Sequence, residues 1–425
     1  KRDLPLVQVN LHVRAGTVDD PADRLGLADL TADMLDEGAA GRGALELADE
    51  LEYLGARFGV GAGTHLSTVS LRVPVARLDA ALGLMADVVV RPDFPAAELD
   101  RLRQDRMTYL IRRHDEPNLI ASALFQRTLY GADHPYGRGG VGTAETLAAI
   151  TTDDLRAFHR AHYRPDNATL VVVGDVDAAG IRGRLEAVFA EWRATGAGAA
   201  PARVEPARQV QGRTVYLVDV PGAAQSVIQI GRIGVDRRSD DYYALQVMNT
   251  ILGGSFTSRL NQNLREDKGY TYGARSSFDF SPVPGPFVAG AAVQTDATAP
   301  ALVEFMKELE AVREPIPEEE VALARNFLAM RYPAGFQSVA GIAGRLADVI
   351  QYGLPADYFN EYTDRVLAVT REDVERVARR YIDPENVVIV IVGDRSAVED
   401  EVRALGLGEL RVLEVTDVLG PVPTE

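Results

Sequence analysis

The chain of 425 residues contains no cysteine, which excludes disulfide bonds, zinc sites built on thiolates and a cysteine nucleophile. It also has no apolar run approaching the ~20 residues that span a bilayer. Positive charge is scarce, because 45 Lys and Arg stand against 62 Asp and Glu and give a formal net charge of −17. Nucleic-acid binding requires clustered basic side chains that meet the phosphates. We therefore expect neither a nucleic-acid partner nor a membrane span.

Histidine is the main remaining zinc ligand in a chain without cysteine. The six histidines all lie in the first half of the sequence: His12, His65, His114, His134, His159 and His162. His159 and His162 are three residues apart on an expected helix, a spacing that can bind metal, but no acidic third ligand stands beside them. His134, in the segment HPYG, is expected to anchor a turn. The histidines therefore favour no metal site in this chain.

Two segments of the chain repeat each other. Residues 151–176 read TTDDLRAFHRAHYRPDNATLVVVGDV, and residues 370–395 read TREDVERVARRYIDPENVVIVIVGDR. Every matched position in this window, Gly174 with Gly393 for example, is separated by the same 219 residues, which indicates an internal duplication. Each copy predicts a helix, a turn containing proline, and a β-branched run that ends in Gly-Asp. Such a run is typical of a buried central strand.

The remaining pattern predicts the fold class and the domains. Strands and helices are mixed without a strict βαβ alternation, which is typical of an α+β protein. Residues 193–212 are rich in Ala, Gly and Pro and lack any periodicity, so we predict a linker there. The sequence therefore predicts two homologous domains, residues 1–192 and residues 213–425, each a sheet backed by helices.

The segment GLADLTADMLDEG places two carboxylates on one helix face. The spacing of Leu27, Leu30 and Met34 predicts an amphipathic helix. Asp29 and Asp33 are four residues apart, so they lie one above the other on its polar face. The pair is either half of a calcium or magnesium site or a solvated surface. Because such metal sites usually use a loop with several converging oxygens, the regular helix favours the solvated surface.

The most distinctive segment of the chain is GGSFTSRLNQNLREDKGYTYG. It predicts a helix that Gly269 ends, followed by a strand that begins at YTY, with Tyr270 and Tyr272 on one face. Arg265 offers a rigid donor fork and Tyr272 a neutral donor, which together suit a peptide carbonyl or a developing oxyanion. The alternative from the residues alone is a surface arginine and a half-buried tyrosine.

This segment resembles the second-domain signature of the pitrilysin-like zinc peptidases, the family of insulinase and the mitochondrial processing peptidase. In that signature an arginine is followed by a tyrosine seven residues later, as Arg265 is by Tyr272. The resemblance extends over most of the chain, through RAGTVDDPADRLGLADLTADMLDEG, LADELEYLGARFG, HPYG, YRPDNATLVVVGDV and LGGSFTSRL. It implies two duplicated α+β domains, each a mainly antiparallel sheet backed by helices.

The resemblance also implies that a zinc motif has been lost. Family members carry the inverted motif H-x-x-E-H, in which two histidines bind zinc and the glutamate activates water. This sequence has Asp29, Ala32 and Asp33 at those positions. Where the family's further glutamate ligand lies on a later helix, the chain has Thr108 and Tyr109. The resemblance therefore implies that the chain alone neither holds catalytic zinc nor cleaves peptides.

The retained arginine and tyrosine imply a role beside a partner. In two-subunit members of the family the zinc and the Arg–Tyr pair lie on opposing chains. The resemblance implies a non-catalytic subunit of a heterodimer, with no cofactor of its own, whose Arg265 and Tyr272 act on a peptide substrate bound by a zinc-bearing homologous subunit. The alternative is an inactive structural or peptide-binding homologue that works as a scaffold. Because bacterial relatives are often exported, a periplasmic or secreted location is favoured over the cytoplasm.

Overall fold

The computed structural model describes residues 4–200 and 202–423, which form two compact units. The first unit is drawn from Lys1–Tyr109, Gly139–Arg203 and Pro333–Pro355, and the second from Leu110–Arg138, Val204–Tyr332 and Ala356–Glu425. The units therefore differ from the expected domains by two exchanged segments, 110–138 and 333–355. The expected linker contains no helix or strand in residues 193–200 and 202–212, and the division between the units falls within it, after Arg203.

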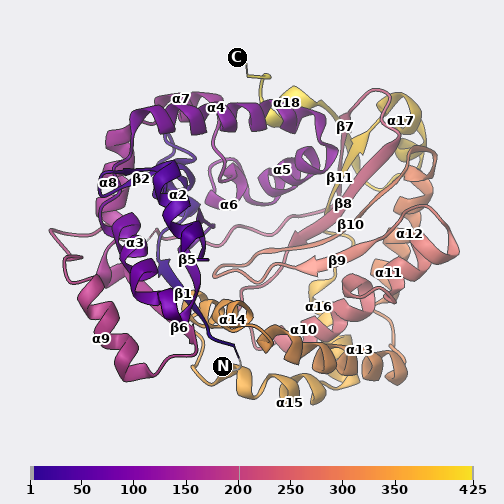
Figure 1. The fold of residues 1–425 in the computed structure, drawn as a ribbon. Helices are drawn as coiled ribbons and strands as arrows, with labels where there is room; N and C mark the ends of the chain where they lie inside the picture. The colour runs from indigo at the N-terminus through magenta and orange to yellow at the C-terminus, as the bar shows by residue number, and fades with distance from the viewer. Residues whose placement is uncertain (1–3, 201, 424–425) are drawn as a thin grey trace. The chain divides into compact units, whose positions relative to one another are not determined.

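The first unit contains a four-stranded antiparallel sheet in the order β4-β5-β1-β6 (Figure 1). Its strands are β1 (Leu6–Val13), β4 (Arg57–Ala62), β5 (Ser67–Pro74) and β6 (Ala168–Gly174), with a small β2 (Gly38–Ala39) and β3 (Arg42–Gly43) pair apart from them. Its helices are α1 (Leu27–Asp33), α2 (Ala44–Tyr53), α3 (Leu78–Val90), most of α4 (Ala96–Arg112), α7 (Ala144–Ala149), α8 (Thr152–His162), α9 (Ala178–Val188) and α14 (Val339–Tyr352). Alternate residues of β5 are buried, as expected of a strand with one face on a core.

The second unit contains a six-stranded sheet in the order β12-β7-β11-β8-β10-β9 (Figure 1). Its strands are β7 (Thr214–Asp219), β8 (Gln225–Ile233), β9 (Arg275–Phe278), β10 (Pro286–Gln294), β11 (Val388–Gly393) and β12 (Glu409–Glu414). Only β7 pairs in parallel, with β11 and β12, while the other pairs are antiparallel. The predicted α+β class with mainly antiparallel sheets is confirmed.

The second unit also contains α-helices and two π-helices. The α-helices are α5 (Pro117–Tyr130), α6 (Pro135–Arg138), α10 (Tyr242–Asn249), α11 (Arg259–Asn261), α12 (Thr298–Ala311), α13 (Glu318–Arg331), α15 (Tyr362–Leu367), α16 (Arg371–Tyr381), α17 (Arg395–Ala404) and α18 (Val415–Leu419). Two π-helices, Thr250–Gly254 and Gln262–Asp267, flank a short loop. In residues 4–200 and 202–423, none of the helices combines the length and apolarity needed to cross a membrane.

The sequence repeat forms the same helix start in both units. Thr151 caps α8 and Thr370 caps α16, and each hydroxyl accepts a hydrogen bond from the backbone N–H of an aspartate three residues later. That aspartate in turn accepts from the threonine N–H, so each helix begins with a reciprocal capping box. The prediction of a buried central strand is confirmed for β11, whose six residues are all buried between β7 and β8.

The same prediction is wrong for β6, which is an edge strand and only partly buried. In the second unit β7 adds a parallel strand beside β11, whereas in the described part of the first unit β6 pairs with β1 alone. One face of β6 is covered by α14, whose Val339 and Ala343 pack against Val171 and Val173. The exchanged segment 333–355 therefore supplies the cover that this edge strand lacks in its own half of the sequence.

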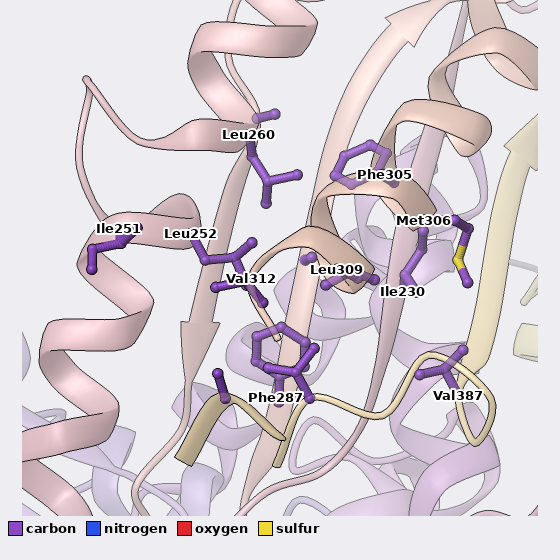
Figure 2. Packing of buried hydrophobic residues seen from close by; sticks show 14 of the residues in the cluster. Ile230, Ile251, Leu252, Leu260, Phe287, Phe305, Met306, Leu309, Val312 and Val387 are labelled. Atoms are coloured by element: carbon purple, nitrogen blue, oxygen red, sulfur yellow. The ribbon is translucent and has the colours of Figure 1, made fainter. Parts of the chain in front are cut away.

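The core of the second unit fixes the segment that carries Arg265. Figure 2 shows Leu252 and Leu260 in the same packed cluster as Phe305 and Leu309 of α12. Leu260 and Leu264 are fully buried in this cluster. Each buried side chain of this size contributes roughly 1.5–3 kcal/mol. The helical segment before and through Arg265 is therefore anchored from one side by the core.

The opposite face of the second sheet is covered by α5, the other exchanged segment. Ile120, Leu124 and Phe125 of α5 are buried in a cluster with the β11 valines. Gly231 of β8 permits this contact, because a Cβ there would lie 2.8 Å from the Phe125 ring and 2.0 Å from the Phe287 carbonyl oxygen. The first half of the sequence thus completes the core of the second unit.

We expect Phe125→Ala to lower the free energy of unfolding by about 3–5 kcal/mol, because it leaves a cavity between α5 and the sheet. The measurement is urea unfolding followed by circular dichroism. Met330→Ala is the matched control, since Met330 is exposed on α13 and its loss should change stability by less than about 0.5 kcal/mol. Equal unfolding midpoints for the two variants would contradict the packing role of α5.

Candidate functional site

The helix at the zinc-motif positions, α1, has the predicted buried face, with Leu27 and Leu30 in the core. It begins at Gly26, which adopts φ +93° and approaches the Val141 carbonyl too closely for a side chain. Its first N–H groups donate to the buried Asp20 carboxylate, from Gly26 at 2.8 Å and from Ala28 at 2.7 Å. Burial nevertheless raises the pKa of Asp20 to about 7.

The two carboxylates on α1 share one cation. Arg106 of α4 forms an ion pair with Asp29 Oδ2 at 2.7 Å and donates to Asp33 through its second terminal nitrogen. The side chains of Arg106, Asp29 and Asp33 are 23%, 21% and 29% exposed. The expectation of a solvated surface is therefore wrong, because α4 places a guanidinium between the two carboxylates and removes most of their contact with water.

Burial is the main influence on the ionisation of Asp29. It raises the pKa of Asp29, the Arg106 guanidinium opposes that rise, and the neighbouring Asp33 adds to it. Two half-buried carboxylates on adjacent helical turns repel each other unless a cation lies between them. Arg106 supplies that cation from within the chain, and its planar fork reaches both carboxylates at once.

The residues at these positions do not fit zinc. Both carboxylates are engaged by the guanidinium, and Ala32 is buried and carries no group that could activate water. Thr108, near the position of the family's further ligand, donates its hydroxyl hydrogen to the Gln104 carbonyl within α4. Across residues 4–200 and 202–423, no three His, Asp or Glu side chains are grouped so that they could hold a metal.

The histidines serve packing and turns. His159 Nε2 donates to the Val89 carbonyl over 2.8 Å, and burial lowers the pKa of the imidazole. His162 stacks against Phe158 with ring centroids 4.3 Å apart. The predicted turn anchor at His134 is confirmed, since Nδ1 accepts from the Tyr136 N–H and Nε2 donates to the Glu205 carbonyl.

The helical segment that carries Arg265 ends at Gly269 as predicted, but the strand predicted after it does not form. Gly269 has φ +68° and donates to the Arg265 carbonyl over 3.1 Å, so it ends the π-helix. The expected strand at YTY is wrong, because Thr271 forms a single bridge with Val293 and β9 begins only at Arg275. The Thr271 hydroxyl donates to the Ala292 carbonyl and accepts from the Gly273 N–H, which closes a local turn.

The turn separates the two tyrosines that a regular strand would place together. Tyr270 is partly buried and packs against the core, whereas Tyr272 is 93% exposed. The interpretation of Tyr272 as a half-buried side chain is therefore wrong. In the described part of the chain its hydroxyl forms no hydrogen bond with another residue, so the donor faces solvent.

Arg265 is also left without a strong partner. Its guanidinium lies 4.4 Å from the centre of the Phe256 ring, and its ion pair with the neighbouring Glu266 is long, at 3.5 Å. Within residues 4–200 and 202–423 the guanidinium makes no hydrogen bond. The structure therefore presents Arg265 and Tyr272 from one short segment with their donors unused, although the two side chains do not contact each other.

Sequence reasoning missed two contributors to these sites. The ion pair of Arg106 was not predicted, because its partners are more than seventy residues away in the sequence. The only signal was the presence of an arginine on the helix where the family's further zinc ligand was expected. The contribution of Phe256 was also not predicted. Its signal in the sequence was an aromatic side chain two residues after the pair Gly253 and Gly254, within the distinctive segment.

Comparisons with known proteins cover both halves of the chain. The model described as insulinase (peptidase family M16) matches residues 3–132, and the model described as peptidase M16 inactive domain matches residues 149–328. An uncharacterized zinc protease of Mycobacterium tuberculosis is 26% identical over 402 residues, which are 93% of this chain and 91% of that protein. One of Streptomyces coelicolor is 25% identical over 375 residues, 87% of this chain and 81% of that protein.

Solved structures share the fold. The crystal structure of a peptidase M16 inactive domain from Pseudomonas fluorescens has a TM-score of 0.86 and 30% identity, and the match covers 93% of this chain and 94% of that one. A protease from Helicobacter pylori has a TM-score of 0.84 at 20% identity, covering 92% of this chain and 95% of that one, a likeness of fold alone.

We expect Arg106→Met to lower the free energy of unfolding by at most about 3 kcal/mol, the lower end of the cost of breaking a buried ion pair, because these side chains keep part of their solvent contact. Thermal unfolding measures the loss. Adding Asp29→Asn and Asp33→Asn to the same variant should recover part of it, since the unpaired charges are then gone.

The matched control is Arg365→Met, which breaks a surface pair with Glu361 on one helix and should change stability little. If Arg106→Met and Arg365→Met have the same melting temperature, the guanidinium does not stabilise α1.

Asp36 is one of the carboxyl groups that contribute to the pH dependence of stability near α1, together with Asp20 and Asp29. Burial raises the pKa of Asp36 from 3.8 to about 6, with Glu37 and Asp33 adding to the rise. The folded state therefore prefers the protonated carboxyl, so this contribution to stability is fully present below the unfolded pKa of 3.8 and is lost as the pH rises through about 6.

Asp36→Asn should remove this loss. The free energy of unfolding of the variant, relative to that of the natural chain, should therefore increase as the pH rises from 3.8 to about 6. Urea unfolding at several pH values across this range measures the difference. A difference between the two chains that does not change with pH would contradict the shifted pKa as its cause.

Proposed function

We propose that this chain, which belongs to peptidase family M16, is the non-catalytic subunit of a two-chain zinc peptidase. The observation that carries the proposal is the contrast between Arg106 and Arg265. Arg106 is paired with both carboxylates at the zinc-motif positions, whereas Arg265 has only a long ion pair with Glu266 and makes no hydrogen bond within the described residues, seven residues before an exposed Tyr272. An exposed tyrosine hydroxyl and a guanidinium without a hydrogen bond, in one short segment, leave donors that a bound peptide could accept from.

In the proposed complex a homologous partner that carries H-x-x-E-H would hold the zinc, which would supply Lewis-acid chemistry at the peptide carbonyl and at water. This chain supplies neither ligand nor base. Arg265 would donate from its fork to a backbone carbonyl of the bound polypeptide and hold it in register. Tyr272 would donate its hydroxyl hydrogen to the oxygen on which negative charge develops. Covering both groups by the partner would exclude water and strengthen these hydrogen bonds.

A second candidate function is peptide binding without chemistry, as a scaffold. It is supported by a cavity of about 640 Å³ beside the same segment, lined in part by Ile251, Leu323 and Phe327. Leu323 and Phe327 are exposed at its edge, and Arg259 in its wall is paired with Glu320. Most of the lining is polar or charged, as at Lys268 and Glu308, and a pocket of such mixed character suits a peptide that offers both backbone hydrogen bonds and a side chain. Under this alternative the chain binds peptides and adds nothing to the turnover of any homologue.

The test of the leading proposal is Tyr272→Phe in a complex purified with an H-x-x-E-H homologue. Loss of an oxyanion donor typically costs about 10²–10³ in rate, so we expect kcat for peptide cleavage to fall at least about tenfold. Tyr53→Phe is the matched control, because Tyr53 is likewise exposed but lies on α2 of the first unit. Unchanged turnover in the Tyr272→Phe variant would contradict the role assigned to this hydroxyl.

A further inference from the structure

Phe256 is an apolar side chain in an unusual place. It lies in the loop between the two π-helices, is 66% exposed, and stacks its ring under the Arg265 guanidinium at 4.4 Å. π-Helical turns are rare and frequently mark functional sites. An exposed phenylalanine adds little to a core, whereas an aromatic ring under a guanidinium restricts the directions in which its fork can point. The contact therefore acts on Arg265 more than on stability.

The loop that carries Phe256 is fixed by a buried amide. Asn261 is only 4% exposed and donates from Nδ2 to the Phe256 carbonyl over 2.6 Å. The loop is also held at its start, where the Ser255 hydroxyl donates to the Thr250 carbonyl over 3.2 Å. The backbone of Phe256 is thus held at a set position relative to the helical segment that leads to Arg265.

The other end of the same amide reaches the chain just beyond Tyr272. Asn261 Oδ1 accepts from the Ala274 N–H over 3.3 Å, two residues after Tyr272. Asn261 also precedes Arg265 by one helical turn. One buried side chain therefore connects the Phe256 loop, the Arg265 helix and the Tyr272 turn.

Without the Phe256 ring, Arg265 could form a closer ion pair with a neighbouring carboxylate. Glu266 lies beside it in sequence and already approaches its Nε at 3.5 Å. A guanidinium released from the ring could shorten that ion pair and turn its fork away from solvent. The ring under Arg265 therefore favours the conformation in which the donors stay available.

We propose that Asn261 and Phe256 are positioning residues for Arg265 and Tyr272. The inference rests on the proposed function of that pair. Phe256 orients the guanidinium, and Asn261 sets the spacing between the loop under Arg265 and the turn that presents Tyr272. Neither side chain touches the reacting atoms. Their effect is on the direction and separation of the two donors.

The first experiment needs no partner. The Nε–H resonance of Arg265, assigned by its loss in Arg265→Lys, should carry a ring-current shift from Phe256 in the full chain. We expect Phe256→Leu to remove that shift while Phe256→Tyr keeps it, and Asn261→Ala to reduce it. An Arg265 resonance that is the same in the natural chain and in Phe256→Leu would overturn the orienting role of the ring.

The second experiment uses the complex with the zinc-bearing homologue. Phe256→Leu should lower kcat/KM by about two- to fivefold, the rate equivalent of an exposed cation–π contact, and Phe256→Tyr should restore it. Asn261→Ala should lower kcat/KM by more, because it disturbs both donors. The matched control is Asn386→Ala, since the Asn386 amide likewise donates to Asp383 and accepts from the Gly212 N–H but lies outside this segment.

The outcomes separate the two proposals. If Arg265→Ala and Tyr272→Phe lose turnover while Phe256→Leu and Asn261→Ala match the Asn386→Ala control, the positioning inference is wrong and the proposed function stands. If Arg265→Ala keeps full turnover, the proposed function is wrong. The resonance experiment then decides by itself whether Phe256 orients the arginine.

Discussion

The guanidinium of Arg106 between Asp29 and Asp33 is the interaction on which the account of this chain depends. Two half-buried carboxylates on adjacent turns need a cation, and a metal ion or a side chain can provide it. In this chain the cation is covalently part of α4, so it cannot exchange with solvent. The ion pair thereby holds α1 against α4 and leaves neither carboxylate free to bind a metal.

Arg265 in the second unit differs from Arg106 in its contacts. Arg265 lies on a segment whose leucines are fully buried, but its guanidinium has only a long ion pair with Glu266 and lies over the Phe256 ring. Tyr272 follows after a local turn that directs it to solvent. A satisfied arginine in one unit and an available arginine in the other support a division of labour, in which this chain contributes donors and a homologous chain contributes the metal.

Local patterns in the sequence predicted local structure well. The leucine spacing predicted the buried face of α1, the repeat predicted the capped helices at Thr151 and Thr370, and Gly269 predicted a helix end. Features set by distant partners were not predictable in this way. Neither the edge position of β6 nor the exchanged helices α5 and α14 follow from periodicity, because each depends on which strand or sheet lies alongside. The Arg106 ion pair was missed for the same reason, and the turn at Thr271 because a side-chain hydrogen bond ended the expected strand after one bridge.

The central claim is that this chain completes an active site whose zinc belongs to another subunit. It is tested most directly by titrating a zinc-bearing homologue with this chain while peptide cleavage is measured. We expect that neither chain alone cleaves the peptide efficiently and that activity rises to a plateau at equimolar mixing. Full activity of the homologue alone, unchanged by this chain, would contradict the account, as would zinc bound stoichiometrically to this chain in its isolated form.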